Sequence, residues 1–428
     1  MKSRTEFEPC EYEFEIPPFT KEMKKTHMIL APDIFPVHMD LLQAVFRMYG
    51  YNLVVLHYTG KQVIQKGLEC IHNDMCYPLI CLTGQQIYAL TCGDFDPRKC
   101  ALIQFQTGGG CRASNYIWLV RKALHNMGMD YVPVISLSFT QIEKSPGFRI
   151  TPMMIVKGMV AIIYGDLLML LRNQVRPYEA HKGETDALVE RWNGIIAGQF
   201  KANKGLVGKK FRDNLHAIVR DFADIEKLNV RKTKVGIVGE IYVKYSPLGN
   251  NGLEAFLDSQ NCEYMVPGVL PFFMTLFQNH ITDHELYGGS RAKLGINRTL
   301  LRAMRKIEKA MDDALREESD FTRPLPFDEL VKLGEKTLDT GVKMGEGWLL
   351  PAEIAELIED GYSNVICAQP FGCLPNHIVA KGTARTIRNL YPDANLCPVD
   401  YDSGASVVNL ENRIKLMLAM AAEKEGAV

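Results

Sequence analysis

Four cysteines stand in local sequences that could support metal chemistry. They are Cys76, Cys111, Cys367 and Cys373. Each belongs to a segment that combines cysteine with glycine or proline, where a predicted strand or loop gives way to a predicted helix. A helix N-terminus stabilises a thiolate, which is the form of cysteine that binds a metal. The remaining seven of the eleven cysteines are interpreted as small core residues.

Cys111 follows a run of three glycines, Gly108, Gly109 and Gly110. The run lies between a predicted strand at 101–105 and a predicted helix, at the strand end where open α/β sheets bind ligands. Glycines let the backbone approach a bound group and expose its N–H donors. A Walker A loop would need Gly-Lys-Ser/Thr, and a dinucleotide fingerprint would need GxGxxG; neither pattern fits. A purely structural glycine turn is the alternative.

The other two segments repeat this design. Cys76 precedes a predicted helix with Pro78 in its first turn, where proline is tolerated. Cys367 ends a predicted strand, Gly372 permits a tight bend, and Pro375 marks the start of the next helix. Turns of this kind in both halves of the chain would converge on a cleft between domains. Structural zinc prefers short C-x₂-C spacings, and none occurs, so ligands from distant turns favour an iron–sulfur cluster.

A catalytic thiol is the main non-metal alternative. Cys111 could pair with His72 or His377 as its base, but one nucleophile leaves the other flanked cysteines unexplained. Asp400 and Asp402 follow the last predicted strand at the same rim. They fit a helix N-cap and turn as well as a binding role.

The composition is typical of a soluble globular protein, with 47% hydrophobic and 23% charged residues. A formal net charge of -1 argues against nucleic acid as the main partner, because phosphate binding needs a basic face. The apolar stretch 153–171 is interrupted by lysine, aspartate and glycine, so we expect a buried helix and no membrane partner. The N-terminus has no apolar core, and many cysteines without a secretory signal favour reduced thiols and a cytoplasmic location.

Strands that alternate with helices are expected to position the cysteines. Buried apolar runs are predicted as strands at 28–32, 52–56, 101–105, 132–137, 234–239, 263–266, 363–367 and 395–399. Such runs, separated by helical stretches, predict parallel sheets covered on both faces. We therefore predict an α/β protein with two Rossmann-like or flavodoxin-like domains and a metal site in the cleft between them. The predicted parts are an extension at 1–26, an N-terminal domain at 27–150, a helical connection at 151–232 and a C-terminal domain at 233–428.

Four segments resemble the 2-hydroxyacyl-CoA dehydratase superfamily. They are NDMCYP at 73–78, QTGGGCRASNY at 106–116, QPFGCLPNH at 369–377 and DYDSG at 400–404. The resemblance spans about residues 27 to 420 and is closest to the branch found in very large fused activase proteins and as separate dehydratase-like chains. Benzoyl-CoA reductase subunits and double-cubane cluster proteins are relatives.

The resemblance implies an oxygen-sensitive cubane cluster held by three cysteines per subunit, two from the N-terminal domain and one from the C-terminal domain. On this chain they are Cys76, Cys111 and Cys367, with Cys373 as a fourth ligand or a substitute for Cys367. An ATP-hydrolysing activase, itself an iron–sulfur homodimer, supplies one low-potential electron. In the dehydratases this electron makes a ketyl radical from a thioester, which allows loss of the β-proton and the α-hydroxyl.

The sequence also departs from this family. The dehydratases pair two related subunits, and here there is one chain, so a related subunit or a second copy is the expected partner. A double cubane would need about six ligands, and only cysteines outside any motif could supply them, so one [4Fe-4S] cluster is preferred. Arg112, Asn115 and His377 are the candidate catalytic residues. The function implied is a lyase or low-potential reductase subunit; an electron-transfer or cluster-carrying subunit is the alternative, and a metal-free scaffold the third.

Overall fold

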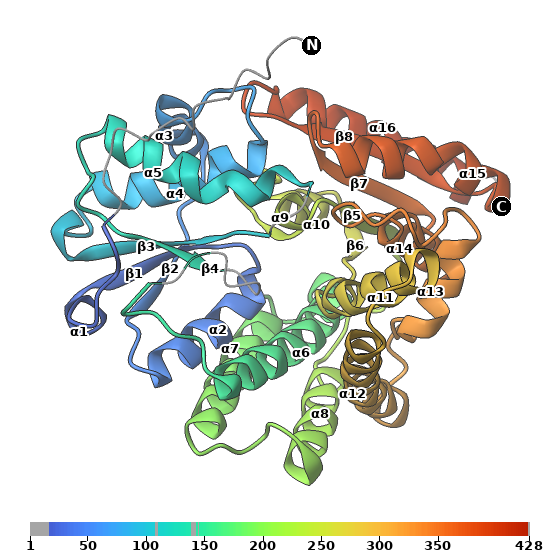
Figure 1. Cartoon of the computed structure of the whole chain (residues 1–428). Coiled ribbons are helices and arrows are strands. Elements are labelled where there is room, and N and C mark those ends of the chain that lie inside the picture. The colour runs from blue at the N-terminus through green and yellow to red at the C-terminus, as the bar shows by residue number, and fades with distance from the viewer. Residues whose placement is uncertain (1–16, 108–109, 138–142, 144, 427–428) are drawn as a thin grey trace, which may run out of the picture.

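The chain folds around two parallel sheets, which confirms the predicted α/β class. The computed structural model describes residues 17–107, 110–137, 143 and 145–426. Within these residues each sheet has four strands, and all paired strands run parallel. Figure 1 shows the sheets side by side, with the N-terminal sheet in blue and cyan. Both sheets have the flavodoxin-like order in which the second strand precedes the first.

The N-terminal sheet has the order β2-β1-β3-β4. Its strands are β1 (Met28–Pro32), β2 (Leu53–Leu56), β3 (Cys100–Phe105) and β4 (Val134–Leu137). The helices around it are α1 (Met23–Thr26), α2 (Pro36–Met48), α3 (Lys61–Cys70), α4 (Tyr77–Thr91) and α5 (Tyr116–Asn126), with short 3₁₀ turns η1 (Pro97–Lys99) and η2 (Arg112–Asn115). The strands are continuous apolar runs because helices cover both faces of the sheet.

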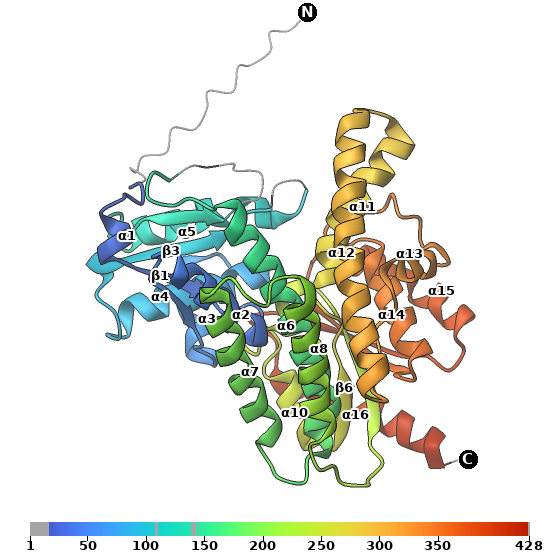
Figure 2. The same ribbon diagram turned by 90° about the horizontal axis from the view of Figure 1, so that it is seen from below.

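The C-terminal sheet has the order β6-β5-β7-β8. Its strands are β5 (Thr233–Gly239), β6 (Cys262–Met265), β7 (Asn364–Pro370) and β8 (Asn395–Tyr401). Its helices are α9 (Ile241–Tyr245), α10 (Leu253–Ser259), α11 (Leu270–Tyr287), α12 (Arg291–Glu318), α13 (Phe327–Glu335), α14 (Leu349–Glu359), the π-helical turn η4 (Asn376–Lys381), α15 (Gly382–Leu390) and α16 (Val407–Gly426). Figure 2 shows α11 and α12 projecting together as an arm.

The part of the chain between the last strand of the first sheet and the first strand of the second is helical, and no strand was expected there. They are α6 (Pro152–Val175), η3 (Arg176–Tyr178), α7 (Glu184–Lys201) and α8 (Gly208–Ala223). Among the described helices, α6 alone is long and apolar enough to cross a membrane, but 78% of its most apolar window is buried inside the protein. That burial is typical of the core helix of a soluble protein, as the sequence predicted.

Helix α6 joins the two halves through Asp166. The carboxylate accepts hydrogen bonds from the backbone N–H groups of Val269 (2.7 Å) and Leu270 (2.8 Å), at the start of α11. It also bonds Nε2 of His38, a buried residue of α2, at 2.8 Å. One buried carboxylate thus caps a helix of the C-terminal half and holds a side chain of the N-terminal half.

A Gly165→Ala variant is expected to lose about 1–3 kcal/mol of unfolding free energy, because a Cβ at this position would lie 2.3 Å from the His38 ring. Urea unfolding followed by circular dichroism measures the effect. Gly194→Ala on α7 is the matched control, since a Cβ there meets nothing within 4 Å and should be neutral or stabilising. An unchanged midpoint for Gly165→Ala would contradict the close packing of α6 on α2.

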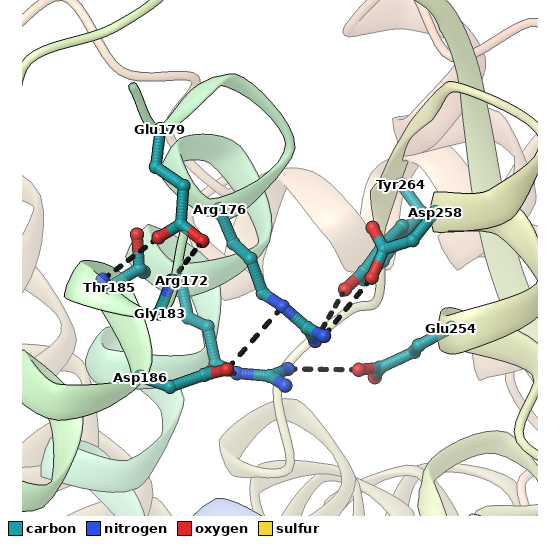
Figure 3. Close-up of polar contacts among 9 residues, drawn as sticks. All are labelled: Arg172, Arg176, Glu179, Gly183, Thr185, Asp186, Glu254, Asp258 and Tyr264. Atoms are coloured by element: carbon teal, nitrogen blue, oxygen red, sulfur yellow. Dashed lines mark hydrogen bonds and ion pairs between the residues drawn. The ribbon is translucent and has the colours of Figure 1, made fainter. Parts of the chain in front are cut away.

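Two arginines at the end of α6 form a second link between the halves (Figure 3). Arg172 donates to Asp186 of α7 at 2.7 Å and to Glu254 of α10 at 2.9 Å. Arg176 lies near Asp186 and Asp258, at 3.5 and 3.2 Å. Because these ion pairs are partly buried and form a network, they are screened less than isolated surface pairs. The network fixes the C-terminal sheet relative to α6 and α7.

Candidate thiol site between the sheets

The strand order places the carboxyl ends of four strands where a ligand would bind. In each sheet the connections leave in opposite directions from a pair of neighbouring strands, β1 and β3 or β5 and β7. Such switch points are the usual ligand sites of open α/β sheets. The chain leaves β3 toward Cys111, β5 toward Glu240 and β7 toward Cys373. Figure 1 shows α9, which follows Glu240, between the two sheets.

Cys76 lies at the N-cap of α4, and Pro78 occupies the first turn, as the sequence predicted. Its half-buried thiol accepts a hydrogen bond from the hydroxyl of Tyr116 at 2.9 Å. Tyr116 is the first residue of α5, so the helix that follows the glycine loop also holds the Cys76 sulfur. The two N-terminal cysteine loops are therefore coupled.

Cys111 stands before the 3₁₀ turn η2, and α5 begins only at Tyr116. The Ser114 hydroxyl donates to the Cys111 carbonyl at 2.8 Å. Arg112 donates to the backbone carbonyl of Asp74 at 3.2 Å, which ties this loop to the Cys76 loop. The predicted residues Gly108 and Gly109 lie outside the described residues.

A loop of the C-terminal half packs directly on the glycine loop. A Cβ at Gly110 would lie 2.6 Å from the Met344 sulfur, and a Cβ at Gly345 would lie 2.7 Å from Pro375. Residues 341–348 thus touch the Cys111 loop on one side and the Cys373 loop on the other. The atoms that a Cβ at Gly110 would meet belong to the flexible end of the Met344 side chain, so this contact shows that the loops are close without making glycine obligatory.

The structure places Cys373 in the loop after β7 and Cys367 inside that strand. Cys373 follows the end of β7 and is half-buried, and Asn376 donates to its sulfur at 3.4 Å. Cys367 lies inside β7, paired in register with Val238 and Pro398, and is 2% exposed. The charged groups that act on the Cys367 thiol are Arg388 and Lys381 on the α15 side, not those around Cys76 and Cys111.

Two carboxyl groups meet at the start of α9, where Glu240 is the N-cap and Glu346 comes from the 341–348 loop. Glu240 accepts a hydrogen bond from the backbone N–H of Val243 at 2.9 Å, and Glu346 accepts from that of Ile241 at 3.1 Å. Burial, and then the charge of Glu346, raise the pKa of Glu240 to about 8. Burial also raises the pKa of Glu346. The pair therefore holds a proton at neutral pH.

Glu240 is a titratable neighbour that Cys76, Cys111 and Cys373 share. When ionised, its carboxylate acts on the thiols of Cys76, Cys111 and Cys373, and that of Glu346 acts on the last two. Burial first and these charges second raise the pKa of Cys76 to about 12, and the pKa values of the other two also rise. A helix dipole was expected to stabilise a thiolate at Cys111 and so to lower the pKa of that thiol. Burial outweighs this effect, because η2 is only four residues long. A bound metal would overcome this cost, since coordination deprotonates a thiol outright.

The three candidate catalytic side chains lie at the rim. Arg112 and Asn115 are exposed, and Asn115 has no side-chain cap bond. His377 contacts Asp400 at 3.0 Å, beside the 2.7 Å bond of Lys381 to the same carboxylate. Burial would raise the pKa of Asp400, but the bonds from Lys381 and Gln369 outweigh it and lower the pKa. Asp400 is thus held in a charged network, whereas the side chain of Asp402 bonds the next backbone N–H in a turn.

The nucleophile alternative finds no base in this arrangement. The His72 ring is turned to Asp74, whose backbone N–H donates to it at 3.2 Å, and His377 is engaged by Asp400. In the described part of the chain no hydrogen bond joins a histidine to Cys76, Cys111 or Cys373. The thiol pKa values are also raised, the opposite of an activated nucleophile.

The three thiols are of the ligand type that iron–sulfur clusters use. Across the residues that the structure describes, no three His, Cys, Asp or Glu side chains stand close enough to bind one metal ion. The thiolates around a cubane bind different irons and so stand further apart than the ligands of one ion. The Tyr116 and Asn376 donors to sulfur are the hydrogen bonds that tune such clusters. A [4Fe-4S] cluster is therefore the hypothesis that these three thiols raise.

Sequence reasoning did not find Glu240, Glu346, Tyr116 or Asn376 as site residues. Glu240 could have been found, because it directly follows a predicted strand. Glu346 has no local signal, because only the packing of its loop brings it to α9. Comparison with protein-family models, with curated proteins and with solved structures finds no match to this chain. The family resemblance of the cysteine segments therefore stays a hypothesis.

Proposed function

We propose that this chain is an oxygen-sensitive iron–sulfur protein that binds one [4Fe-4S] cluster through Cys76, Cys111 and Cys373. It receives a low-potential electron from an ATP-hydrolysing iron–sulfur activase and uses it for radical dehydration or reduction of a small acyl substrate. A CoA thioester of the kind handled by 2-hydroxyacyl-CoA dehydratases is the substrate class we favour. The protein works in the cytoplasm, paired with a related subunit or a second copy.

The observation that supports the proposal is the electrostatic effect of Glu240 on three cysteines from both halves, Cys76, Cys111 and Cys373. Two of them accept hydrogen bonds at sulfur, from Tyr116 and Asn376. When bound, the cluster supplies one-electron chemistry and an iron that three thiolates leave open. One proton shared by the Glu240–Glu346 pair leaves one negative charge there, and a nearby negative charge lowers the potential of such a cluster, which suits a low-potential electron.

Glu240 has a second role in this proposal. Its carboxyl is half-buried, bonds the Val243 N–H and keeps a proton at neutral pH. A neutral acid in such a place donates a hydrogen bond to a substrate carbonyl oxygen and can release or take up a proton during reduction or elimination. A substrate with a free carboxylate at its reacting end is disfavoured beside Glu240 and Glu346, whereas a neutral thioester is accepted.

Electron transfer without a substrate is the second candidate, and one observation favours it. Cys81 is fully buried in α4, and the charges of Glu240 and Cys76 act on its thiol. As a fourth ligand it would occupy the iron position that three thiolates leave free. A metal site with every position filled by protein has no place for a substrate. Its neighbours Tyr77 and Tyr242 hydrogen-bond its thiol, which favours a core role instead.

Anaerobic purification and reconstitution, with iron and sulfide analysis and EPR of the reduced protein, test the proposal. We expect about four irons per chain and a cubane signal. Addition of a 2-hydroxyacyl-CoA should change that signal in wild type and in Cys81→Ala alike. A signal that the thioester leaves unchanged, with iron lost in Cys81→Ala, would favour electron transfer. A chain that binds no iron under these conditions would contradict both functions.

A further inference from the structure

Helices α11 and α12 form an arm whose tip is apolar. Figure 2 shows the pair projecting past the rest of the molecule. Large apolar side chains are exposed around the turn that joins the two helices, and they are Leu286, Tyr287, Ile296 and Leu300. The most exposed are Tyr287 at 80% and Ile296 at 60%. Exposed apolar groups gathered on one element mark an interaction surface.

The same part of the arm is strongly basic. Residues 291–309 contain seven lysines and arginines and one acidic residue, Glu308, which gives a net charge of +6. Because the whole chain has a net charge of -1, the rest of it carries -7. An anionic surface therefore attracts the arm and on average repels the remainder, which orients the molecule with the arm toward that surface.

Four of the seven basic residues are exposed and form no ion pair with a described residue. They are Arg291, Lys293, Arg302 and Lys306. The other three pair with carboxylates of α11, α13 and α12 itself. Arg291 and Lys293 lie in the first turn of α12, where the helix dipole favours acidic residues and none is present. Cations in this position cost helix stability, so an anionic partner outside the chain explains them better than the fold does.

We propose that the tip of the arm binds the surface of a membrane that contains anionic lipids. Leu286, Tyr287 and Ile296 enter the interface between headgroups and acyl chains, and the unpaired cations contact the headgroups. Apolar and aromatic side chains flanked by lysine and arginine are the combination that holds a helix on such a surface. The contact is peripheral, because α6, the one described helix apolar enough to span a membrane, stays in the core. The inference goes beyond the proposed function and does not depend on it.

The position of the apolar groups favours a membrane over a protein partner. Leu286 and Tyr287 end α11, and Ile296 lies in the second turn of α12, so these groups surround the end of a helical hairpin. A flat bilayer can receive such an end, whereas a protein would need a hollow that matches it. A second copy of the chain would bring another basic arm to a symmetric contact, where like charges repel.

Co-sedimentation of the purified full chain with lipid vesicles tests the proposal. One set of vesicles is phosphatidylcholine alone, and the other is an equal mixture of phosphatidylcholine and phosphatidylglycerol. We expect binding to the mixed vesicles and little to the neutral ones. Binding should also weaken as salt is added, because part of the attraction is between charges.

Two double variants separate the charges from the apolar groups. Arg291→Gln with Lys293→Gln removes two cations, each worth about fivefold in affinity for an anionic surface, so binding should weaken roughly 25-fold. Tyr287→Ser with Ile296→Ser should weaken it about tenfold or more, because two side chains no longer enter the interface. All four positions are exposed, so the variants are expected to fold.

Helix α16 supplies the matched controls. Figure 2 shows it at the opposite end of the molecule from the tip of the arm. Arg413→Gln with Lys415→Gln removes two exposed cations, and Leu416→Ser removes an exposed apolar side chain. Both controls should bind the mixed vesicles as the wild type does.

A second measurement detects entry of the tip into the bilayer. Tyr287→Trp puts a fluorophore at the exposed end of α11, and the wild-type chain with its three tryptophans is the blank. The added emission should shift to shorter wavelength with the mixed vesicles, and lipids with brominated acyl chains should quench it.

Absence of binding to the mixed vesicles would overturn the proposal. Wild-type binding by both double variants would also overturn it, because the contact would then lie elsewhere. Binding that needs Arg291 and Lys293 without any shift in Tyr287→Trp emission would favour an acidic protein surface as the partner instead. None of these results depends on whether a cluster binds to the thiols.

Discussion

A Cys373→Ala variant is expected to lose the bound iron, while Cys367→Ala keeps it. The thiol of Cys373 shares the carboxyl neighbours Glu240 and Glu346 with Cys111, whereas Cys367 is enclosed inside β7. Iron per chain after anaerobic reconstitution should fall from about four to below one in Cys373→Ala, because a cubane held by two cysteines is unstable.

Cys76→Ala and Cys111→Ala should behave like Cys373→Ala, and circular dichroism should show all of them folded. Cys397→Ala is the matched control, since Cys397 is a half-buried thiol on β8 outside the site. Iron lost in Cys367→Ala but retained in Cys373→Ala would return the ligand role to Cys367. Iron retained in both variants would show that neither cysteine of the C-terminal half is needed to bind it.

The two sheets were predictable because buried parallel strands are continuous apolar runs, and each predicted strand overlaps an observed one. The end of β7 was harder to predict from the sequence. The apolar run at 363–367 predicts a strand that stops at Cys367, but pairing with β8 continues through Gln369 and Pro370. Cys367 thereby becomes an interior strand residue, and Cys373 takes the loop position. The three-residue error in the strand end placed Cys367 at a turn, whereas the structure has it inside the strand.

The helix α11 was missed because its start is fixed by a distant residue. The segment 270–287 mixes aromatic, β-branched and polar residues, and no side chain at its own N-terminus forms a cap. Asp166, about a hundred positions earlier, accepts from Val269 and Leu270 instead. A cap supplied by tertiary contact leaves no local signal in the sequence.

Around the candidate thiol site, too, some features have a local sequence signal and others arise only from contacts between distant segments. Cys76 and Cys111 were predictable because proline and glycine mark their turns locally. The carboxyl pair was not, because Glu346 reaches α9 only through the contacts of its loop with Gly110 and Pro375. The pKa values that follow from this pair, and with them the proton held at the site, depend on the folded arrangement.

The protein is expected to become less stable as the pH rises from about 5 to 8, and Glu356→Gln should remove part of that loss. Burial raises the pKa of Glu356 from 4.5 to about 8, and its side chain is 6% exposed. Between these values the folded chain keeps a proton that the unfolded chain releases, so raising the pH favours unfolding. The slope is at most about 1.4 kcal/mol per pH unit for one group.

The folded and unfolded pKa values of Glu356 differ by about 3.5 units (8 minus 4.5). The unfolding free energy of Glu356→Gln should therefore exceed that of wild type by roughly 2–5 kcal/mol at pH 8, and the difference should vanish near pH 4. The glutamine oxygen can still accept the 2.7 Å bond from the Leu325 N–H, so the substitution removes the titration and not the contact. Urea unfolding at pH 5 and pH 8 measures the difference, with Glu359→Gln as the control on the same helix. A Glu356→Gln chain that loses stability with pH as steeply as wild type would show that Glu356 is already ionised in the folded protein.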